Sequence, residues 1–200
     1  NNEYHQIGLK SKISHHTFTE ITTLSKYSNT IKTINACYNT SYFMSDFGNL
    51  YTCGDNSNGL NGINKKMLGA FQFKEISNHI RCVDIKVGYE HVIILDNNNA
   101  IYSFGSNTYG QCGVSQNIEI LYQPRWIKFR NKSKINLKNI FCNDYSTIII
   151  TDNLDMWLFG KNDNNESLMD SNGNNIYSPK CIRNKSLIKL LKLNALQDIK

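Results

Sequence analysis

The stretch Ile101–Gly113 decides the fold, and it reads Ile-Tyr-Ser-Phe-Gly-Ser-Asn-Thr-Tyr-Gly-Gln-Cys-Gly. A short β-prone run ends in Gly105, and Asn107, Gly110 and Gly113 follow two, five and eight residues later. A chain that leaves a sheet sharply needs a residue that accepts a positive φ, and glycine does so without steric cost. The stretch therefore predicts a strand that ends at a glycine and is followed by a tight loop.

The same pattern recurs along the chain. Upstream, Gly54 is followed at the same offsets by Asn56, Gly59 and Gly62. Downstream, Gly160 is followed by Asn162, and then by Asn165 and Leu168 where the two glycines would stand. The chain also opens inside a copy, with Asn2, His5 and Gly8. Asparagine and histidine tolerate positive φ better than most residues, so we expect His5 and Asn165 to replace glycine. The marker glycines are 51 and 55 residues apart, and a period of about fifty residues is typical of propellers, solenoids and arrays.

β-prone runs recur in the same order in the three copies, with four runs in the second and third copies and three in the first. In the second copy these are Ile80–Val87, Val92–Leu95, Ile101–Phe104 and Pro124–Phe129. The first copy offers Ile31–Ile34, Tyr42–Met44 and Leu50–Cys53, and the third offers Leu137–Cys142, Thr147–Ile150, Met156–Phe159 and Pro179–Ile182. Pro124 and Pro179 each stand nineteen residues after a marker glycine, and we expect them to open an outer strand, where sheets tolerate proline. The segment Leu187–Leu193 suits a helix as well as a strand.

Four strands per repeat without a convincing helix predict an all-β protein, a β-propeller of four-stranded antiparallel blades. We expect one propeller segment over residues 1–200, with repeats at approximately 1–30 (partial), 31–79, 80–136, 137–186 and 187–200 (partial). Three full repeats and two partial ones make a partial ring of about three to four blades.

The repeats resemble those of the regulator of chromosome condensation family. In the second copy the resemblance rests on Gly88, His91, Leu95, Tyr102, Ser103, Gly105, Asn107, Gly110, Gln111, Gly113 and Pro124, with Phe104 in place of a tryptophan. The first copy matches at Gly48, Leu50, Tyr51, Gly54, Asn56, Gly59 and Gly62, and the third keeps Trp157, Gly160, Asn162 and Pro179. The resemblance implies a seven-bladed ring, so we expect the remaining repeats in the same longer chain. A smaller closed ring or an assembly of two chains stays open. It also implies that His91 packs and hydrogen-bonds within its blade.

Composition narrows the class of protein. The formal net charge is +6 with a pI of 8.9, which falls short of the pI above about 9 expected of a dedicated nucleic-acid module. The six cysteines are widely spaced and form no zinc pattern, so we interpret them as small core residues in a reducing, intracellular compartment, either nuclear or cytoplasmic. The apolar runs are too short to cross a bilayer. No catalytic, cofactor-binding or metal-binding motif is present, and we expect no cofactor and no membrane partner.

Basic residues gather in one run, Leu121–Ile140, which contains no acidic residue. Its basic residues are Arg125, Lys128, Arg130, Lys132, Lys134 and Lys138, interleaved with Trp126 and Phe129. A second group lies near the end of the next repeat: Lys180, Arg183, Lys185, Lys189 and Lys192. The run is interpreted first as a solvated loop between blades, with Trp126 and Phe129 turned to the core. The alternative is that both groups form one patch for an acidic partner or nucleic acid, because basic and aromatic side chains together hold phosphates and stack on bases.

The functional expectation is a binding module that holds a protein partner on its loop face, since loops on a rigid scaffold carry function. The family resemblance implies one alternative, guanine-nucleotide exchange on a Ran-like small GTPase, which needs no acid-base catalytic residue. A further alternative is attachment to chromatin or RNA through the basic patch.

Overall fold

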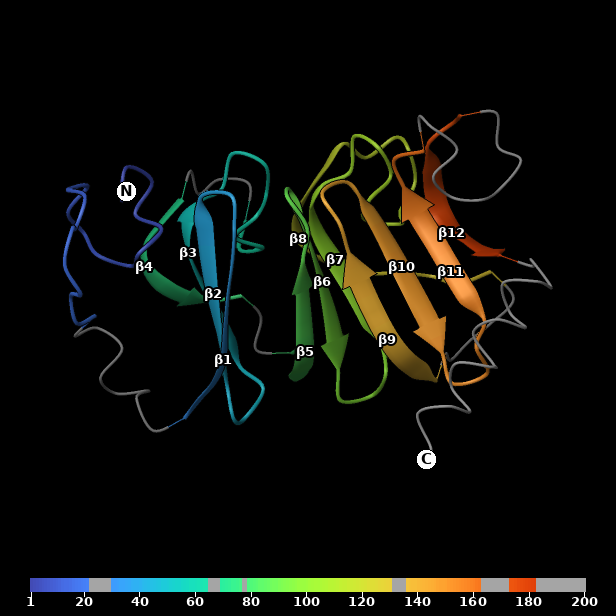
Figure 1. Cartoon of the computed structure of the whole chain (residues 1–200), viewed down its shortest axis with the longest axis horizontal. Helices are drawn as coiled ribbons and strands as arrows, with labels where there is room; N and C mark the ends of the chain where they lie inside the picture. The colour runs from blue at the N-terminus through green and yellow to red at the C-terminus, as the bar shows by residue number, and fades with distance from the viewer. Residues whose placement is uncertain (22–29, 65–68, 77–78, 131–135, 163–172, 183–200) are drawn as a thin grey trace.

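A computed structural model describes residues 1–21, 30–64, 69–76, 79–130, 136–162 and 173–182. Within these ranges the chain forms twelve strands in three four-stranded antiparallel sheets (Figure 1). The predicted fold class, an all-β propeller segment, is confirmed. The expectations for Asn165, Leu168 and Leu187–Leu193 fall outside the described residues.

Each sheet is one blade, and its strands follow one another in chain order. Blade 1 comprises β1 (Ile31–Cys37), β2 (Thr40–Ser45), β3 (Leu50–Asp55) and β4 (Gly69–Glu75). Blade 2 comprises β5 (Cys82–Val87), β6 (His91–Asp96), β7 (Ile101–Ser106) and β8 (Ile120–Trp126). Blade 3 comprises β9 (Leu137–Cys142), β10 (Ser146–Thr151), β11 (Met156–Gly160) and β12 (Ile176–Ile182).

The first strand of each blade lies innermost. Strand β5 contacts both β1 and β9, so the three first strands stand side by side around a shared axis. The turns after these first strands, together with the glycine loops, lie at the top of Figure 1. We call this the glycine-loop end. The turns between the second and third strands lie at the bottom, which we call the crossover end.

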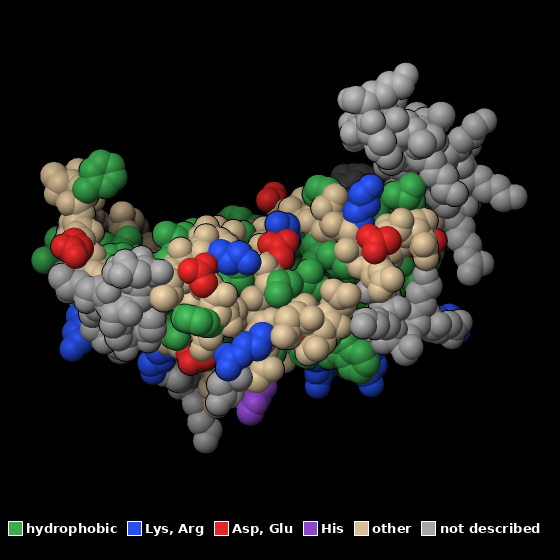
Figure 2. All heavy atoms as spheres, turned by 90° about the horizontal axis from the view of Figure 1, so that it is seen from below, with side chains coloured by type: hydrophobic (Ala, Val, Ile, Leu, Met, Phe, Trp, Pro, Cys, Tyr) green, Lys and Arg blue, Asp and Glu red, His purple; other side chains and the backbone are tan. Residues whose placement is uncertain are grey.

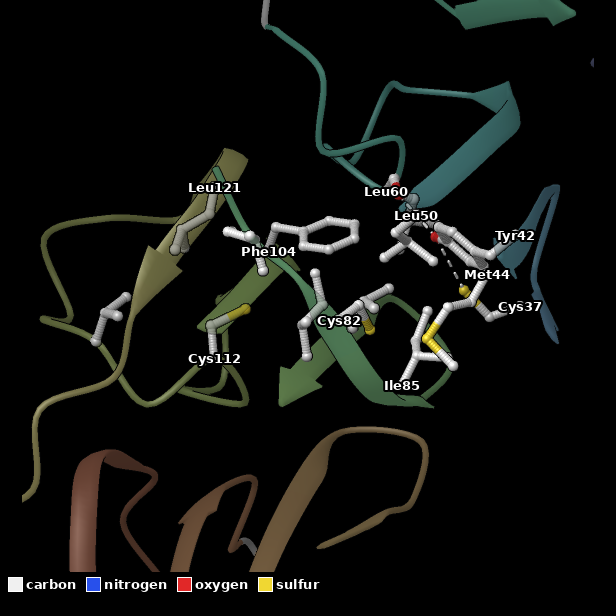
Figure 3. Packing of buried hydrophobic residues seen from close by; sticks show 14 residues of the cluster. Cys37, Tyr42, Met44, Leu50, Leu60, Cys82, Ile85, Phe104, Cys112 and Leu121 are labelled. Carbon is white, nitrogen blue, oxygen red and sulfur yellow. Dashed lines mark hydrogen bonds between the residues drawn. The ribbon is translucent and has the colours of Figure 1, made fainter. Parts of the chain in front are cut away.

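Apolar side chains pack between neighbouring blades. Tyr42 and Met44 of β2 meet Ile85 of β5 and Phe104 of β7 in one cluster (Figure 3). On β6, Ile94 belongs to this cluster while its neighbour Ile93 belongs to a second cluster between blades 2 and 3. Successive residues of a strand point to opposite faces of its sheet. A blade with a neighbour on each side is therefore apolar on both faces, which explains the unbroken run Val92–Leu95.

The cysteines contribute to these cores. All six are free thiols, and Cys37, Cys53, Cys82 and Cys112 are buried. Burial raises the pKa of Cys53 to about 12, so this thiol stays protonated and packs as a small apolar group. Its place in blade 1 is that of Phe104 in blade 2.

The outer strands correct one expectation. Pro124 was expected to open its strand, but β8 begins at Ile120 and ends at Trp126, earlier than the expected Phe129. Ser103 pairs with Arg125 and Gly105 with Leu121, so residues 122–124 lie opposite the single residue Phe104. The same register shift between the third and fourth strands occurs in blade 3, where Pro179 is an interior residue of β12. A bulge on an edge strand makes no use of the missing proline N–H, which is why the proline is tolerated there.

Candidate interaction surface

The marker glycines occupy equivalent places in the three blades. Gly105 has a φ of +105° and lies against the carbonyl oxygen of Glu90, where a Cβ atom would collide with the backbone. Gly54 and Gly160 have φ values of +115° and +116° and lie against the backbone of Asn39 and Tyr145 in the same way. One correction concerns the strand end, because β7 continues one residue past Gly105 to Ser106. Close approach of the second strand, as well as the turn, therefore requires glycine here.

A buried asparagine closes each glycine loop. The Asn107 Oδ1 atom accepts a hydrogen bond from the Cys112 N–H at 3.1 Å, and its Nδ2 donates to the Ile118 carbonyl at 2.7 Å. The Oδ1 atoms of Asn56 and Asn2 accept from the residue five positions on in the same way, each at 3.0 Å. Asn162 is also buried and donates to Asn174 across its own loop at 3.3 Å. His5 has a φ of +60°, as expected for a residue that replaces the second glycine.

The glycine loops after Gly54 and Gly105 rest on the next blade. Gly59 lies against the Leu121 carbonyl, and Gly110 lies against that of Ile176. The third glycines, Gly62 and Gly113, lie on the rings of Phe104 and Phe159. Outer-strand tyrosines complete the contact: Tyr122 donates to the Ser57 carbonyl at 3.4 Å and Tyr177 to the Thr108 carbonyl at 2.8 Å. The repeated glycines and asparagines thus join one blade to the next.

His91 also joins two blades, which corrects the expectation that it bonds within its own. The Thr147 hydroxyl of blade 3 donates to the Gln111 carbonyl at 3.1 Å. The His91 Nε2 atom lies 2.8 Å from the same hydroxyl oxygen, so Nε2 carries the proton and donates it. The ring is fully buried beside Gly88, and burial lowers the pKa of His91 to about 3. His91 is therefore neutral and structural.

The basic residues lie apart on different elements. Arg125 is on β8, Lys128 and Arg130 follow it, Lys138 is on β9 and Lys180 is on β12. Arg125 and Lys180 hold equivalent positions on neighbouring outer strands. Figure 2 shows the crossover end, where the Lys and Arg side chains of the described residues alternate with Asp and Glu. Lys132, Lys134, Arg183, Lys185, Lys189 and Lys192 lie outside the described residues, so the joint patch stays a prediction.

The two aromatic residues of the basic run differ in their burial. Phe129 packs on the core between blades 2 and 3, edge to face with Trp157 at 5.3 Å. Trp126 was expected to face that core too, but it is 48% exposed, and the Lys128 Nζ atom lies 5.8 Å from its ring centroid. Trp126 is on the outer edge strand, and it lines an open groove of about 620 Å³ together with Pro124 and Arg125.

A row of tyrosines lies at the glycine-loop end. Ring centroids are 5.2 Å apart between Tyr38 and Tyr89, 5.8 Å between Tyr89 and Tyr145, and 5.2 Å between Tyr145 and Tyr109. All three contacts are edge to face. Tyr38, Tyr89 and Tyr145 come from the turns after β1, β5 and β9, so the row spans all three blades. We call these four residues the tyrosine row.

Charged groups flank the tyrosine row. The Lys161 Nζ atom lies 5.4 Å from the ring centroid of Tyr109 and 5.8 Å from that of Tyr145. The pKa of Tyr145 is raised by burial first and then by the negative charges of Glu90 and Asp144, among other neighbours. Glu90 is held in place by Asn58, whose Nδ2 donates to Glu90 Oε1 at 2.8 Å.

Single motifs do not reveal this row, although the repeat contains the signal. Tyr38 and Tyr89 both stand sixteen residues before their marker glycine, and Tyr145 stands fifteen before Gly160. Turns at the same offset of successive blades lie at the same end of a propeller. Aligning the repeats by their marker glycines and searching for aromatic residues in the turns would have found it.

Neither a metal-binding cluster nor a membrane-spanning helix is found among the described residues. No group of three or more His, Cys, Asp or Glu side chains there could hold a metal ion. No helix in those ranges is long and apolar enough to cross a membrane.

The four-stranded blades, the shared axis and the loops that bind blade to blade define the class of protein, a β-propeller. Comparison with known protein families identifies the type of repeat. Residues 82–111 and 98–150 each match a family model of the regulator of chromosome condensation (RCC1) repeat. Residues 82–150 therefore carry RCC1 repeats.

Solved propellers show the same fold. Human WBSCR16 superposes with a TM-score of 0.67 at 16% identity, over 78% of this chain and 40% of that one. Yeast RCC1 (Prp20), in its complex with Kap60, gives a TM-score of 0.64 at 19% identity, over 80% of this chain and 38% of that one. A structure of Prp20p from Saccharomyces cerevisiae gives 0.61 at 20% identity, over 80% and 40%. The chain spans less than half the length of each of these propellers.

A curated relative is much longer. The bifunctional serine/threonine-protein kinase/NEDD4-like E3 ubiquitin-protein ligase of Dictyostelium discoideum is 27% identical over 134 residues. The match covers 62% of this chain and 7% of the relative.

Proposed function

We propose that this chain is part of a propeller binding module that holds a protein partner at its glycine-loop end. The observation that carries the proposal is the tyrosine row, in which Tyr38 is 51% exposed and Tyr89 42%. Tyrosine is enriched in protein interfaces because it offers a large contact area at a small cost in side-chain entropy. Contacts between blades fix the row, so little ordering entropy is lost on binding.

The relatives support a role in protein binding. The yeast protein Prp20 has been crystallised with Kap60 and described with binding properties to Gsp1p and histones. The Dictyostelium relative carries a similar segment in a chain named as a kinase and ubiquitin ligase. By analogy, we infer that this propeller contributes binding to a larger protein.

Site-specific photo-crosslinking tests the proposal. A photoreactive phenylalanine analogue placed at Tyr38 of the full-length protein in cells should crosslink to a partner protein. The same analogue at Phe47, which is 74% exposed in the turn after β2 at the crossover end, is the matched control. Crosslinks from position 47 but not from position 38 would place the partner elsewhere and contradict the proposal.

Nucleotide exchange on a Ran-like GTPase stays a finer proposal that rests on the family resemblance. It predicts faster release of labelled GDP from such a GTPase when the full-length protein is added. An unchanged rate of release would leave the scaffold role and remove the exchange role.

A second candidate surface rests on Trp126, because an exposed indole beside Lys128 and Arg125 can stack on a base while the cations hold phosphates. We propose it as a site for an acidic partner, nucleic acid included. Replacing Arg125 and Lys128 with glutamate should weaken binding to single-stranded RNA and lower its salt dependence. The change Trp126→Leu should weaken binding without altering the salt slope. Binding that is equal in all variants would remove this candidate.

A further inference from the structure

We propose that the tyrosine row receives a lysine or arginine side chain from a basic segment of the partner protein. This inference rests on the proposed function and adds the chemistry of recognition. It is carried by three observations: the arrangement of the rings, a cation that the chain itself places on them, and two carboxylates beside them.

The rings are arranged to receive a cation. In an edge-to-face pair, the ring that presents its edge does not use its own faces for the contact, and the face of an aromatic ring carries the negative part of its quadrupole. Tyr38 and Tyr89 are the more exposed members of the row. Among the described residues no Lys or Arg side chain lies over either of these two rings. Their outer faces are therefore available to a cation from another molecule.

Lys161 shows that the row accepts an ammonium group. Its Nζ atom lies within 6 Å of the ring centroids of Tyr109 and Tyr145, which is the range of an attractive cation–π contact. The inner half of the row thus holds a cation from the chain itself. The outer half repeats the same ring geometry without one.

The local charge favours a basic partner although the chain as a whole is positive. Glu90 follows Tyr89 directly, and Asp144 precedes Tyr145. The negative charges of both carboxylates help to raise the pKa of Tyr145. Neither carboxylate forms an ion pair within the described part of the chain. Asn58 fixes the Glu90 carboxylate at the row and leaves its negative charge uncompensated.

Arginine fits this surface better than lysine. A guanidinium group can stack on a tyrosine face and pair with a carboxylate through two parallel N–H donors at the same time. Glu90 is adjacent to Tyr89, so both contacts are within reach of one side chain. We therefore expect the partner segment to be extended and to contain arginine.

Binding of a designed peptide tests the inference. The probe is a labelled Gly/Ser peptide with three arginines, compared with the same peptide in which citrulline replaces arginine. Fluorescence anisotropy with the full-length protein should show clear preference for the arginine peptide. Tyr89→Leu and Glu90→Gln should each weaken its binding about two- to fivefold. Lys161→Gln should strengthen its binding, because the variant frees two ring faces.

Matched variants separate this chemistry from other causes. Phe47→Leu removes an aromatic ring at the crossover end that is more exposed than Tyr89, and Lys138→Gln removes an exposed lysine there. Neither should change the affinity for the arginine peptide beyond experimental error. Melting curves check that every variant is folded.

Three results would overturn the inference. Equal binding of the citrulline peptide would show an apolar surface without cation recognition. Equal strengthening by Lys161→Gln and Lys138→Gln would show an effect of net charge alone. Self-association that Tyr89→Leu abolishes, without peptide binding, would make a second copy the occupant. In each case photo-crosslinking from position 38 still reports whether the proposed function holds.

Discussion

Residues at equivalent positions of the repeat make different contacts, and His91 is the clearest example. Its counterparts in blades 1 and 3 are Thr40 and Ser146, each paired with the marker glycine of its own blade. The larger histidine reaches across to Thr147 of the next blade. The family resemblance identified His91, but which blade it contacts depends on packing that one repeat cannot reveal.

The neutral state of His91 predicts a dependence of stability on pH. Its pKa is about 3 when folded and 6.5 in an unfolded chain. Below pH 6.5 the unfolded chain takes up a proton that the folded chain does not, so acid favours unfolding. The free energy of unfolding should fall by about 1.4 kcal/mol per pH unit, or about 2 kcal/mol between pH 7 and pH 5.

Urea denaturation at both pH values measures this loss. His91→Gln keeps a donor for the Thr147 hydroxyl but does not titrate, so the variant should lose about 2 kcal/mol less than the wild type on acidification. If the two proteins lose the same free energy, other groups cause the pH dependence.

Elements differ in how far the sequence predicts them. The inner and middle strands were placed within a few residues, because Val92–Leu95 and its counterparts are apolar on both faces and end at turn residues. The prediction for the outer strands is wrong, because Pro124 suggests a strand start and the bulge around it leaves no trace in hydrophobic periodicity. The tyrosine row was missed because it consists of turns from three blades, which are neighbours only after folding.

The hydrogen bonds between a glycine loop and a tyrosine of the next outer strand lead to a prediction about blade contacts. Tyr177→Phe removes a hydroxyl that donates to the Thr108 carbonyl at 2.8 Å, and it should lower the free energy of unfolding by about 0.5–1.5 kcal/mol. Tyr122→Phe removes the equivalent bond at 3.4 Å and should cost less. Chemical denaturation of both variants measures the difference. A larger cost for Tyr122→Phe would contradict the idea that these bonds hold the blades together.

At the scale of the whole molecule, three isoleucines show where the ring is open in the described residues. Ile34, Ile85 and Ile140 are equivalent, since they pair with Phe43, Ile94 and Ile149 at the centres of their blades. Ile85 and Ile140 are each 3% exposed because the preceding blade covers them, whereas Ile34 is 73% exposed. Gly8 nevertheless lies on the ring of Phe73, as Gly62 lies on that of Phe104. A glycine loop of the preceding repeat therefore already covers part of blade 1.

This asymmetry predicts that a further blade packs on β1 in the full-length protein. Ile34→Ala should then cost about 2–5 kcal/mol of unfolding free energy, the cost that we also expect of Ile85→Ala and Ile140→Ala, because each change would leave a cavity between two blades. If the β1 face is free, Ile34→Ala should stay within about 0.5 kcal/mol of the wild type, as surface changes usually do. Denaturation of the three full-length variants decides between these outcomes. A cost confined to Ile85→Ala and Ile140→Ala would mean that no blade covers β1 and that the ring does not continue on this side.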